Sequence, residues 1–183
     1  MKKGFTIIEL IFVIVILGIL ASVAIPRLAG TREDAEISTA IGNLRTLLSD
    51  AASYYAVKGN FKDAGGTNSA NWRDFTNVPL VGAAGSGATL GTAITDSTKA
   101  VNAAGSGATA FLAVGGANCI GLNIVEKSGD TPAYIEITPV ANAGGVCAQV
   151  IAKEPVKSFV NSTVPGVQNK KAMAISSNTS IYK

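Results

Sequence analysis

Few residues in this chain have a type and position that suggest chemistry, and the most informative of them is Glu9. It is the one charged residue among the 21 residues from Phe5 to Ile25. A carboxylate on a lipid-facing helix costs up to roughly 2.5–3.5 kcal/mol. A membrane anchor without partners gains nothing from such a charge, so Glu9 is a candidate interaction residue.

The segment that carries Glu9 has the length of a membrane span. As a helix with a rise of 1.5 Å per residue it would be about 31 Å long, which matches the apolar thickness of a bilayer. Lys2 and Lys3 precede it, and the next basic residue is Arg27. The excess of positive charge before the span predicts that the N-terminus stays in the cytoplasm.

The residues around Glu9 carry a second signal. Gly-Phe-Thr-x-x-Glu, from Gly4 to Glu9, follows two lysines and opens the long apolar run. This arrangement resembles the type III signal of the type IV pilin superfamily. The resemblance implies that a membrane peptidase cuts between Gly4 and Phe5 and methylates the new amine of Phe5. It also implies that Glu9 pairs with the Phe5 amine of a neighbouring subunit in an assembled filament.

Three other interpretations of the apolar segment compete with this one. A secretory signal peptide could be cut after Ser22-Val23-Ala24, but the apolar run is too long for one and Glu9 interrupts it. A plain membrane anchor explains the hydrophobicity but not the Gly-Phe…Glu arrangement. A buried core helix would need a protein large enough to cover the segment on all sides. The arrangement of residues 4–9 favours the pilin-like interpretation.

Composition argues against most enzyme and cofactor chemistry. The chain has no histidine, which excludes a Ser-His-Asp or Cys-His site, and its two cysteines are too few for a structural zinc site. The carboxylates are scattered without EF-hand spacing, so no catalytic residue, metal or cofactor is predicted, although a calcium site in a loop stays open. Removal of Lys2 and Lys3 with a leader would lower the formal charge from +3 to +1, which argues against nucleic acid as the main partner.

After Pro26 the pattern becomes that of an amphipathic helix. Apolar residues recur at spacings of three and four, at Ile37, Ile41, Leu44, Leu48, Ala51 and Tyr55. This helical half is expected over residues 27–58, with Gly59 as its stop signal. Gly18 and Pro26 are weak points of the combined helix, where a kink or local melting is expected. The resemblance implies unwinding between them in a filament, and a harmless kink fits the same residues.

The residues that follow the helix are expected to form loops first. Residues 61–77 read as a loop with Trp72 and Phe75 as isolated anchors. The heptapeptide Ala-Ala-Gly-Ser-Gly-Ala-Thr occurs at 83–89 and again at 103–109. Neither copy has the further residues of a phosphate-binding loop, so both are interpreted as surface turns that join short strands.

Alternating apolar residues then predict an antiparallel sheet. The predicted strands lie at 120–124, 134–138, 146–150 and, as a weaker candidate, 172–176. Turns are expected at 128–130 and 143–145. A meander of these strands, packed on the apolar face of the helix, satisfies the pattern.

Cys119 and Cys147 are candidates for a disulfide. They lie beyond a membrane segment, where an oxidising compartment is expected, and each faces away from the most apolar side of its predicted strand. The bridge would close a loop of 29 residues and stabilise the fold by about 3.6 kcal/mol on the chain-entropy model. Members of the pilin family often carry such a bridge near the C-terminus. Here 36 residues follow Cys147, so the match to that enclosed loop stays open.

These features together predict an α+β protein of the pilin fold. We expect a leader at residues 1–4, a membrane and assembly helix at 5–26, the amphipathic half at 27–58 and a β-rich globular head with glycine-rich loops at 59–183. The resemblance implies a structural subunit, not an enzyme, of a type IV pilus that serves adhesion, twitching motility or DNA uptake. The alternatives are a pseudopilin of type II secretion and a membrane-tethered binding module.

The same resemblance implies the partners and the location of the chain. The partners are further copies of the chain in a helical filament, the inner membrane before assembly, the prepilin peptidase, and the pilus or type II secretion assembly machinery. The precursor is expected in a bacterial inner membrane. The assembled subunit is expected in an extracellular pilus or a periplasmic pseudopilus.

Overall fold

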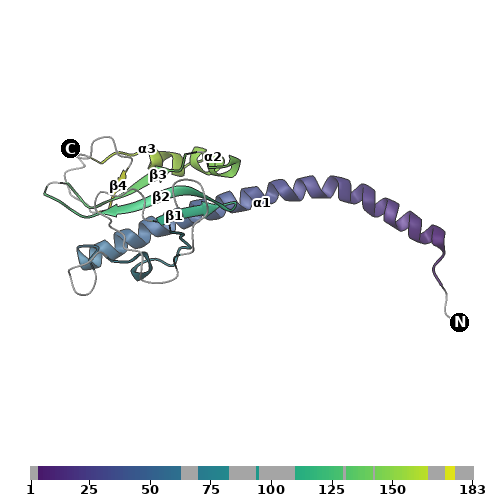
Figure 1. Ribbon diagram of the computed structural model, residues 1–183, viewed down its shortest axis with the longest axis horizontal. Helices are drawn as coiled ribbons and strands as arrows, with labels where there is room; N and C mark the ends of the chain where they lie inside the picture. The colour runs from purple at the N-terminus through teal and green to yellow at the C-terminus, as the bar shows by residue number, and fades with distance from the viewer. Residues whose placement is uncertain are drawn as a thin grey trace. The chain divides into compact units, whose positions relative to one another are not determined.

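The computed structural model describes residues 4–62, 70–82, 94, 110–129, 131–141, 143–164 and 172–175. The chain divides into two compact units, Met1–Glu36 and Ile37–Lys183. Its elements, in chain order, are α1 (Ile7–Lys58), the short 3-10 helix η1 (Trp72–Asp74), β1 (Ala110–Val114), β2 (Ala117–Val125), β3 (Tyr134–Pro139), α2 (Gly145–Ala152), α3 (Val156–Asn161) and β4 (Ala172–Ala174) (Figure 1). A long N-terminal helix and an antiparallel sheet confirm the predicted α+β class.

Helix α1 continues without a break from Ile7 to Lys58. It ends where predicted, because Gly59 adopts a φ of +73°, which a residue with a side chain disfavours. The N–H of Gly59 donates a 2.7 Å hydrogen bond to the carbonyl of Tyr55 and closes the last turn. By length and composition, α1 is long and apolar enough to cross a membrane.

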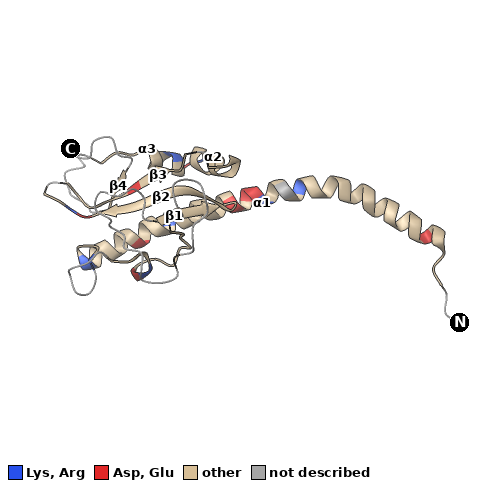
Figure 2. Cartoon of the chain, viewed as in Figure 1, with Lys and Arg blue, Asp and Glu red and all other residues tan. Residues whose placement is uncertain are grey.

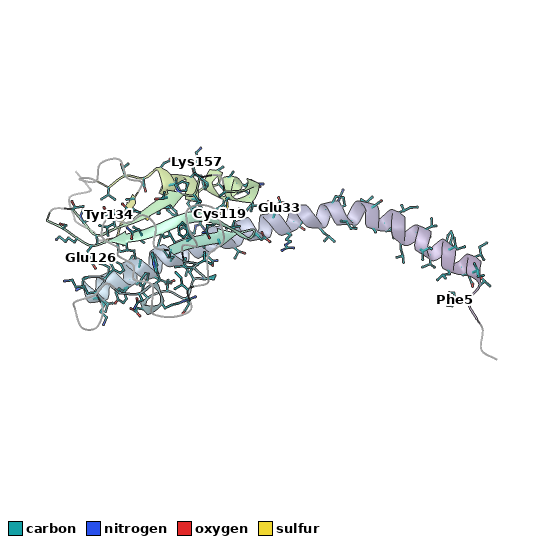
Figure 3. The ribbon with its side chains drawn as sticks, in the orientation of Figure 1. Phe5, Glu33, Cys119, Glu126, Tyr134 and Lys157 are labelled. Atoms are coloured by element: carbon teal, nitrogen blue, oxygen red, sulfur yellow. A yellow bond between two sulfur atoms is a disulfide. The ribbon has the colours of Figure 1, made fainter. Side chains whose placement is uncertain are left out.

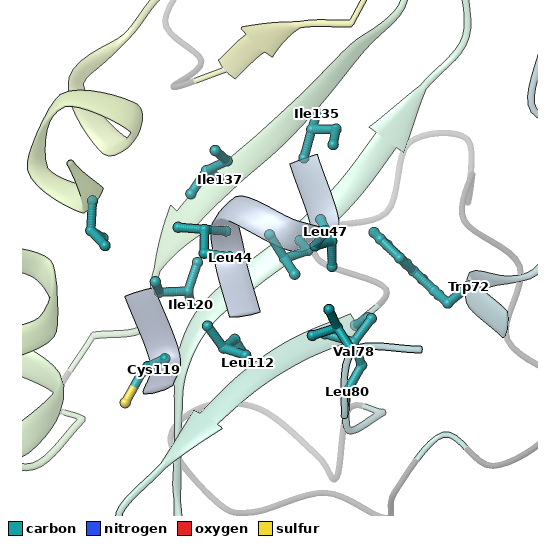
Figure 4. Close-up of a cluster of buried hydrophobic side chains, with 14 of the residues drawn as sticks. Leu44, Leu47, Trp72, Val78, Leu80, Leu112, Cys119, Ile120, Ile135 and Ile137 are labelled. Atoms are coloured by element: carbon teal, nitrogen blue, oxygen red, sulfur yellow. The ribbon is translucent and has the colours of Figure 1, made fainter. Parts of the chain in front are cut away.

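The second half of α1 supplies one face of the core of the second unit. Five of its side chains are fully or almost fully buried, namely Ile37, Ala40, Leu44, Leu47 and Ala51. They form one cluster with the inward-facing residues of the sheet, among them Leu112, Ile120, Leu122, Ile135 and Ile137 (Figure 4). The predicted apolar face is thus confirmed, with Ala40 and Leu47 as additional members.

The sheet has four antiparallel strands in the order β1-β2-β3-β4. In its centre Leu122 pairs with Ile137 and Ile124 with Ile135, which places these side chains on the face toward α1. Gly129, with a φ of +56°, lies in the turn between β2 and β3, where a turn was predicted. The strands predicted at 120–124 and 134–138 are confirmed, and the last candidate forms the shorter β4. Strand β1 was not predicted.

The strand predicted at 146–150 is wrong, because these residues belong to helix α2. Its buried residues are Cys147 and Val150, which are three apart as on a helix, whereas Ala148 is exposed. Figure 1 shows α2 and α3 on the side of the sheet opposite α1. A covering helix buries the second face of the sheet, which a further strand at the edge would leave open.

The two aromatic residues expected as isolated anchors belong to one cluster. Trp72 and Phe75 have ring centroids 5.7 Å apart, and Phe75 lies 5.6 Å from Phe61 and 5.5 Å from Tyr54. The carboxylate of Glu126, the residue that follows β2, accepts a hydrogen bond from the backbone N–H of Phe61 and so ties the end of this strand to the cluster. The two heptapeptide copies at 83–89 and 103–109 lie outside the described residues.

Candidate functional site

The candidate site lies at the start of α1, where three described residues precede the helix. Gly4, Phe5 and Thr6 are not helical, and α1 begins at Ile7. The Phe5 side chain is 86% exposed (Figure 3). The bond predicted for cleavage, between Gly4 and Phe5, therefore lies in accessible non-helical backbone, as a peptidase requires.

Thr6 and Glu9 form a reciprocal cap at the first turn of α1. The backbone N–H of Thr6 donates to Oε2 of Glu9 at 2.8 Å, and the Thr6 hydroxyl donates to the same oxygen at 2.7 Å. The N–H of Glu9 is 3.4 Å from the Thr6 hydroxyl oxygen, which accepts this weaker bond. This is the capping box of a helix N-terminus, in which a Thr and a Glu three residues apart satisfy each other's backbone donors.

The cap uses only one of the two carboxylate oxygens of Glu9. Both hydrogen bonds from Thr6 end on Oε2, and Oε1 accepts none from the described residues. The carboxylate also lies in the first turn of α1, where the partial positive charge of the helix stabilises an anion. Glu9 can therefore cap its own helix and still offer Oε1 to a donor from outside.

Thr6 is the residue of this site that the sequence analysis missed. Its role could have been recognised from Thr-x-x-Glu ahead of an apolar run, which is the sequence signature of a capping box. The sequence analysis predicted a partner of Glu9 on another molecule, whereas the structure shows a partner three residues away on the same chain.

Apolar side chains surround the site on every side of the helix. The large apolar residues from Phe5 to Leu28 are between 40% and 86% exposed, and the most apolar stretch of the helix has no buried residue. Figure 2 shows no charged residue on α1 between Glu9 and Arg27. Glu9 is thus the one acidic residue on a stretch of helix whose large apolar side chains are all exposed.

The two predicted weak points both lie within continuous helix. Pro26 has no N–H, so the carbonyl of Ser22 lacks its normal helical donor. In the same turn, the Ser22 hydroxyl donates a 2.7 Å hydrogen bond to the carbonyl of Ile19. At Gly18 a side chain would meet open space, since no atom outside the local helix lies within 4 Å of the place its Cβ would take. Melting between Gly18 and Pro26 stays a prediction about the assembled state.

In the second unit, the structure contains the predicted disulfide between Cys119 and Cys147. Their Cα atoms are 5.1 Å apart, and both side chains are buried. The bond joins β2 to α2 and not to another strand. It holds α2 against the face of the sheet that points away from α1. Among the described residues, no three His, Cys, Asp or Glu side chains lie close enough to hold a metal ion.

Comparison with known proteins finds similarity in the N-terminal part of the chain. Residues 1–25 match the family model of the prokaryotic N-terminal methylation motif. Type II secretion system core protein G of Dickeya chrysanthemi is 42% identical over 53 residues, which are 29% of this chain and 35% of that protein. Type IV major pilin protein PilA of Myxococcus xanthus (strain DK1622) is 38% identical over 62 residues, which are 34% of this chain and 28% of that protein.

Core protein G of Aeromonas hydrophila shows the same extent of similarity, with 41% identity over 59 residues, which are 32% of this chain and 41% of that protein. The matched region thus spans about a third of the length of these curated relatives. No solved structure matches the chain. The match to the methylation motif covers the candidate site, and the relatives are proteins of two kinds, a pilus subunit and secretion proteins.

Proposed function

We propose that this chain, whose N-terminal segment matches the type IV pilin and pseudopilin superfamily, is a structural subunit of a helical filament. It polymerises through α1 after residues 1–4 are removed and the new N-terminal amine is methylated. The superfamily is structural and not an enzyme family, and we assign no catalytic residue.

One observation carries this proposal, namely the polar pair Thr6–Glu9 at the tip of a helix that is otherwise apolar and exposed. An exposed apolar helix alone fits any membrane anchor. A capped carboxylate with one open oxygen fits a helix that must later leave lipid and contact a second polar group.

The proposed chemistry of assembly follows from the charges at this tip. Cleavage after Gly4 leaves a cationic amine on Phe5, next to Thr6. In a bundle of apolar helices, a carboxylate without a partner would cost several kcal/mol. Oε1 of Glu9 would accept a hydrogen bond from the Phe5 amine of a neighbouring subunit, while Oε2 keeps its bonds to Thr6. This pair sets the axial register of an otherwise uniform apolar seam.

At the finer level, we propose that the filament is a surface type IV pilus for adhesion, twitching motility or DNA uptake. The low charge of the chain, 15% of residues, and its 20 glycines support an exposed fibre subunit. Before assembly the precursor would be held in a bacterial inner membrane by α1. There it would meet the prepilin peptidase and the assembly machinery.

The second candidate is a pseudopilin of a type II secretion system. The similarity of part of the chain to type II secretion core protein G of several bacteria favours it. Electron microscopy of fibres sheared from cells, followed by mass spectrometry, decides between the two. The surface pilus predicts that this chain is the main component of the fibres, whereas the pseudopilin predicts that it stays with the cell.

The test of filament assembly is Glu9→Val, co-expressed with the wild-type chain. We expect membrane insertion and leader cleavage to remain and incorporation into fibres to be lost, because the apolar seam loses its polar partner. Glu33→Gln is the matched control, since Glu33 is an exposed acid on the same helix beyond the apolar segment. Equal incorporation of the Glu9→Val subunit and the wild type would refute the proposed assembly role.

A further inference from the structure

A pocket on the second unit lies outside the proposed assembly site and outside every function discussed above. It has a volume of about 450 Å³ and opens between α2 and α3. Each helix contributes positions i, i+3 and i+4 of one face, and the lining consists of Pro139, Ala148, Ile151, Ala152, Lys157, Val160 and Asn161. This volume falls in the range of about 300–1,000 Å³ that small-molecule sites have.

Both helices that line the pocket are anchored to the core of the second unit. Cys147, next to Ala148, is bound to β2 through the disulfide, and Val150 is buried in the core. On α3, Val156 and Val160 are buried as well. Two alanines, Ala148 and Ala152, line the α2 side, and their small side chains leave the space between the helices open.

The polar side chains of the pocket come from one helix, and both can donate hydrogen bonds. Lys157 offers an ammonium group and Asn161 an amide, both exposed, and none of the lining residues is acidic. No described carboxylate forms a salt bridge with Lys157. Glu154, the nearest acid in the sequence, instead accepts hydrogen bonds from the backbone and hydroxyl of Ser158. Lys157 therefore has no salt-bridge partner within the described part of the chain.

We propose that this pocket binds a small aliphatic carboxylate. The apolar body of the ligand packs against Ile151, Val160 and Pro139, and its carboxylate accepts hydrogen bonds from Lys157 and Asn161. A cationic ligand is disfavoured by the lysine, and a neutral one gains no charge-assisted hydrogen bond from it. Charge complementarity thus selects the anionic member among ligands of equal apolar size.

The test uses the full chain in lipid nanodiscs with ¹³C-labelled isoleucine methyl groups. The Ile151 methyl signal, assigned with Ile151→Val, reports on the pocket itself and is insensitive to probe that partitions into lipid. Sodium hexanoate is the probe, and hexylammonium and 1-hexanol are matched probes of the same chain length. We expect hexanoate to shift the Ile151 signal to saturation, with half-saturation roughly tenfold lower than for hexylammonium.

Two variants separate the contribution of the positive charge from that of the apolar space. Lys157→Gln should raise the half-saturation concentration of hexanoate roughly three- to tenfold, as expected for a partly exposed charge pair. Ala148→Leu should abolish the shift, because the larger side chain fills the space at an exposed helical position. Lys58→Gln, an exposed lysine outside the pocket, should bind as the wild type does.

Several outcomes would overturn the proposal. These are a silent Ile151 signal with hexanoate, equal affinity for the three probes, and unchanged affinity in Lys157→Gln. A response to the peptide acetyl-Leu-Glu-amide without a response to hexanoate would also overturn it and would assign the pocket to an acidic peptide. None of these results bears on filament assembly, which depends on the first turn of α1.

Discussion

The two halves of α1 share one continuous helix but differ in where their apolar side chains lie. From Ile7 to Leu28 the large apolar residues are all exposed, and none of them contacts a core. From Ile37 to Lys58 the apolar residues at spacings of three and four are buried in the core of the second unit. Apolar content alone therefore does not define a core. The spacing of the apolar residues decides whether they lie on one face of the helix, which the rest of the chain can bury.

The difference has a functional consequence. The periodic half has its apolar side chains on a single face, and the sheet of the same chain buries that face. The apolar half has exposed apolar side chains on all sides of the helix, and lipid or further helices are needed to cover them. In the proposed filament, Glu9 with its cap from Thr6 gives such a surface a specific partner.

The largest expected effect is on processing. Gly4→Leu should trap the precursor in the inner membrane, because a bulky side chain would block the cut between Gly4 and Phe5. Mass spectrometry of the membrane-bound chain should find residues 1–4 still attached. Gly30→Ala, a change at an open helical position, should leave processing intact. A mature N-terminus near Ile25 in the wild type would instead establish cleavage by an ordinary signal peptidase.

A matched pair of leucine substitutions tests the comparison directly. Leu44→Ala should lower the free energy of unfolding of the second unit by about 2–5 kcal/mol, because it leaves a cavity in a fully buried site. Leu20→Ala removes the same atoms from an exposed site and should leave this free energy unchanged. Denaturant titration followed by tryptophan fluorescence measures both, since Trp72 lies in the core. Equal effects would mean that both halves of α1 contribute to the same core.

Reduction of the disulfide should act on the second unit alone. Without the bond between Cys119 and Cys147, the unfolding free energy should fall by about 3.6 kcal/mol on the chain-entropy model. Thermal unfolding with and without reductant measures the change, and the double variant Cys119→Ser/Cys147→Ser should show no effect of reductant. Free thiols in extracellular material, or a reductant-insensitive melting curve of the wild type, would contradict this prediction.

The smallest effect is expected at the cap of α1. Thr6→Val removes the hydroxyl and should cost about 0.5–2 kcal/mol of local helix stability, as the loss of an N-cap does. Faster amide hydrogen exchange in the first turn measures it. Thr6→Ser keeps the hydroxyl and should behave as the wild type. Unchanged exchange in Thr6→Val would show that the backbone N–H bond to Glu9 suffices to hold the turn.

The amino-acid sequence by itself determined the features that depend on neighbouring residues. The apolar run, the periodic face of the second helical half and the stop at Gly59 are local patterns, and each predicted its structure correctly. The strands at 120–124 and 134–138 were found for the same reason, since alternation along one strand does not depend on its partner. The polar pair Thr6–Glu9 was also readable in this way, although only Glu9 was recognised.

Only the tertiary structure decided what residues 145–161 become. Val146, Ala148 and Val150 alternate like a strand, yet Cys147 and Val150 are the buried side chains and the segment is helical. A short segment of mixed propensity adopts the secondary structure that buries the most apolar surface in its tertiary context. Here a helix covers the face of the sheet that α1 leaves open. The disulfide from β2 to a helix, the aromatic cluster around Phe61 and the pocket between α2 and α3 have the same origin. They depend on contacts between residues far apart in the chain, which no local pattern records.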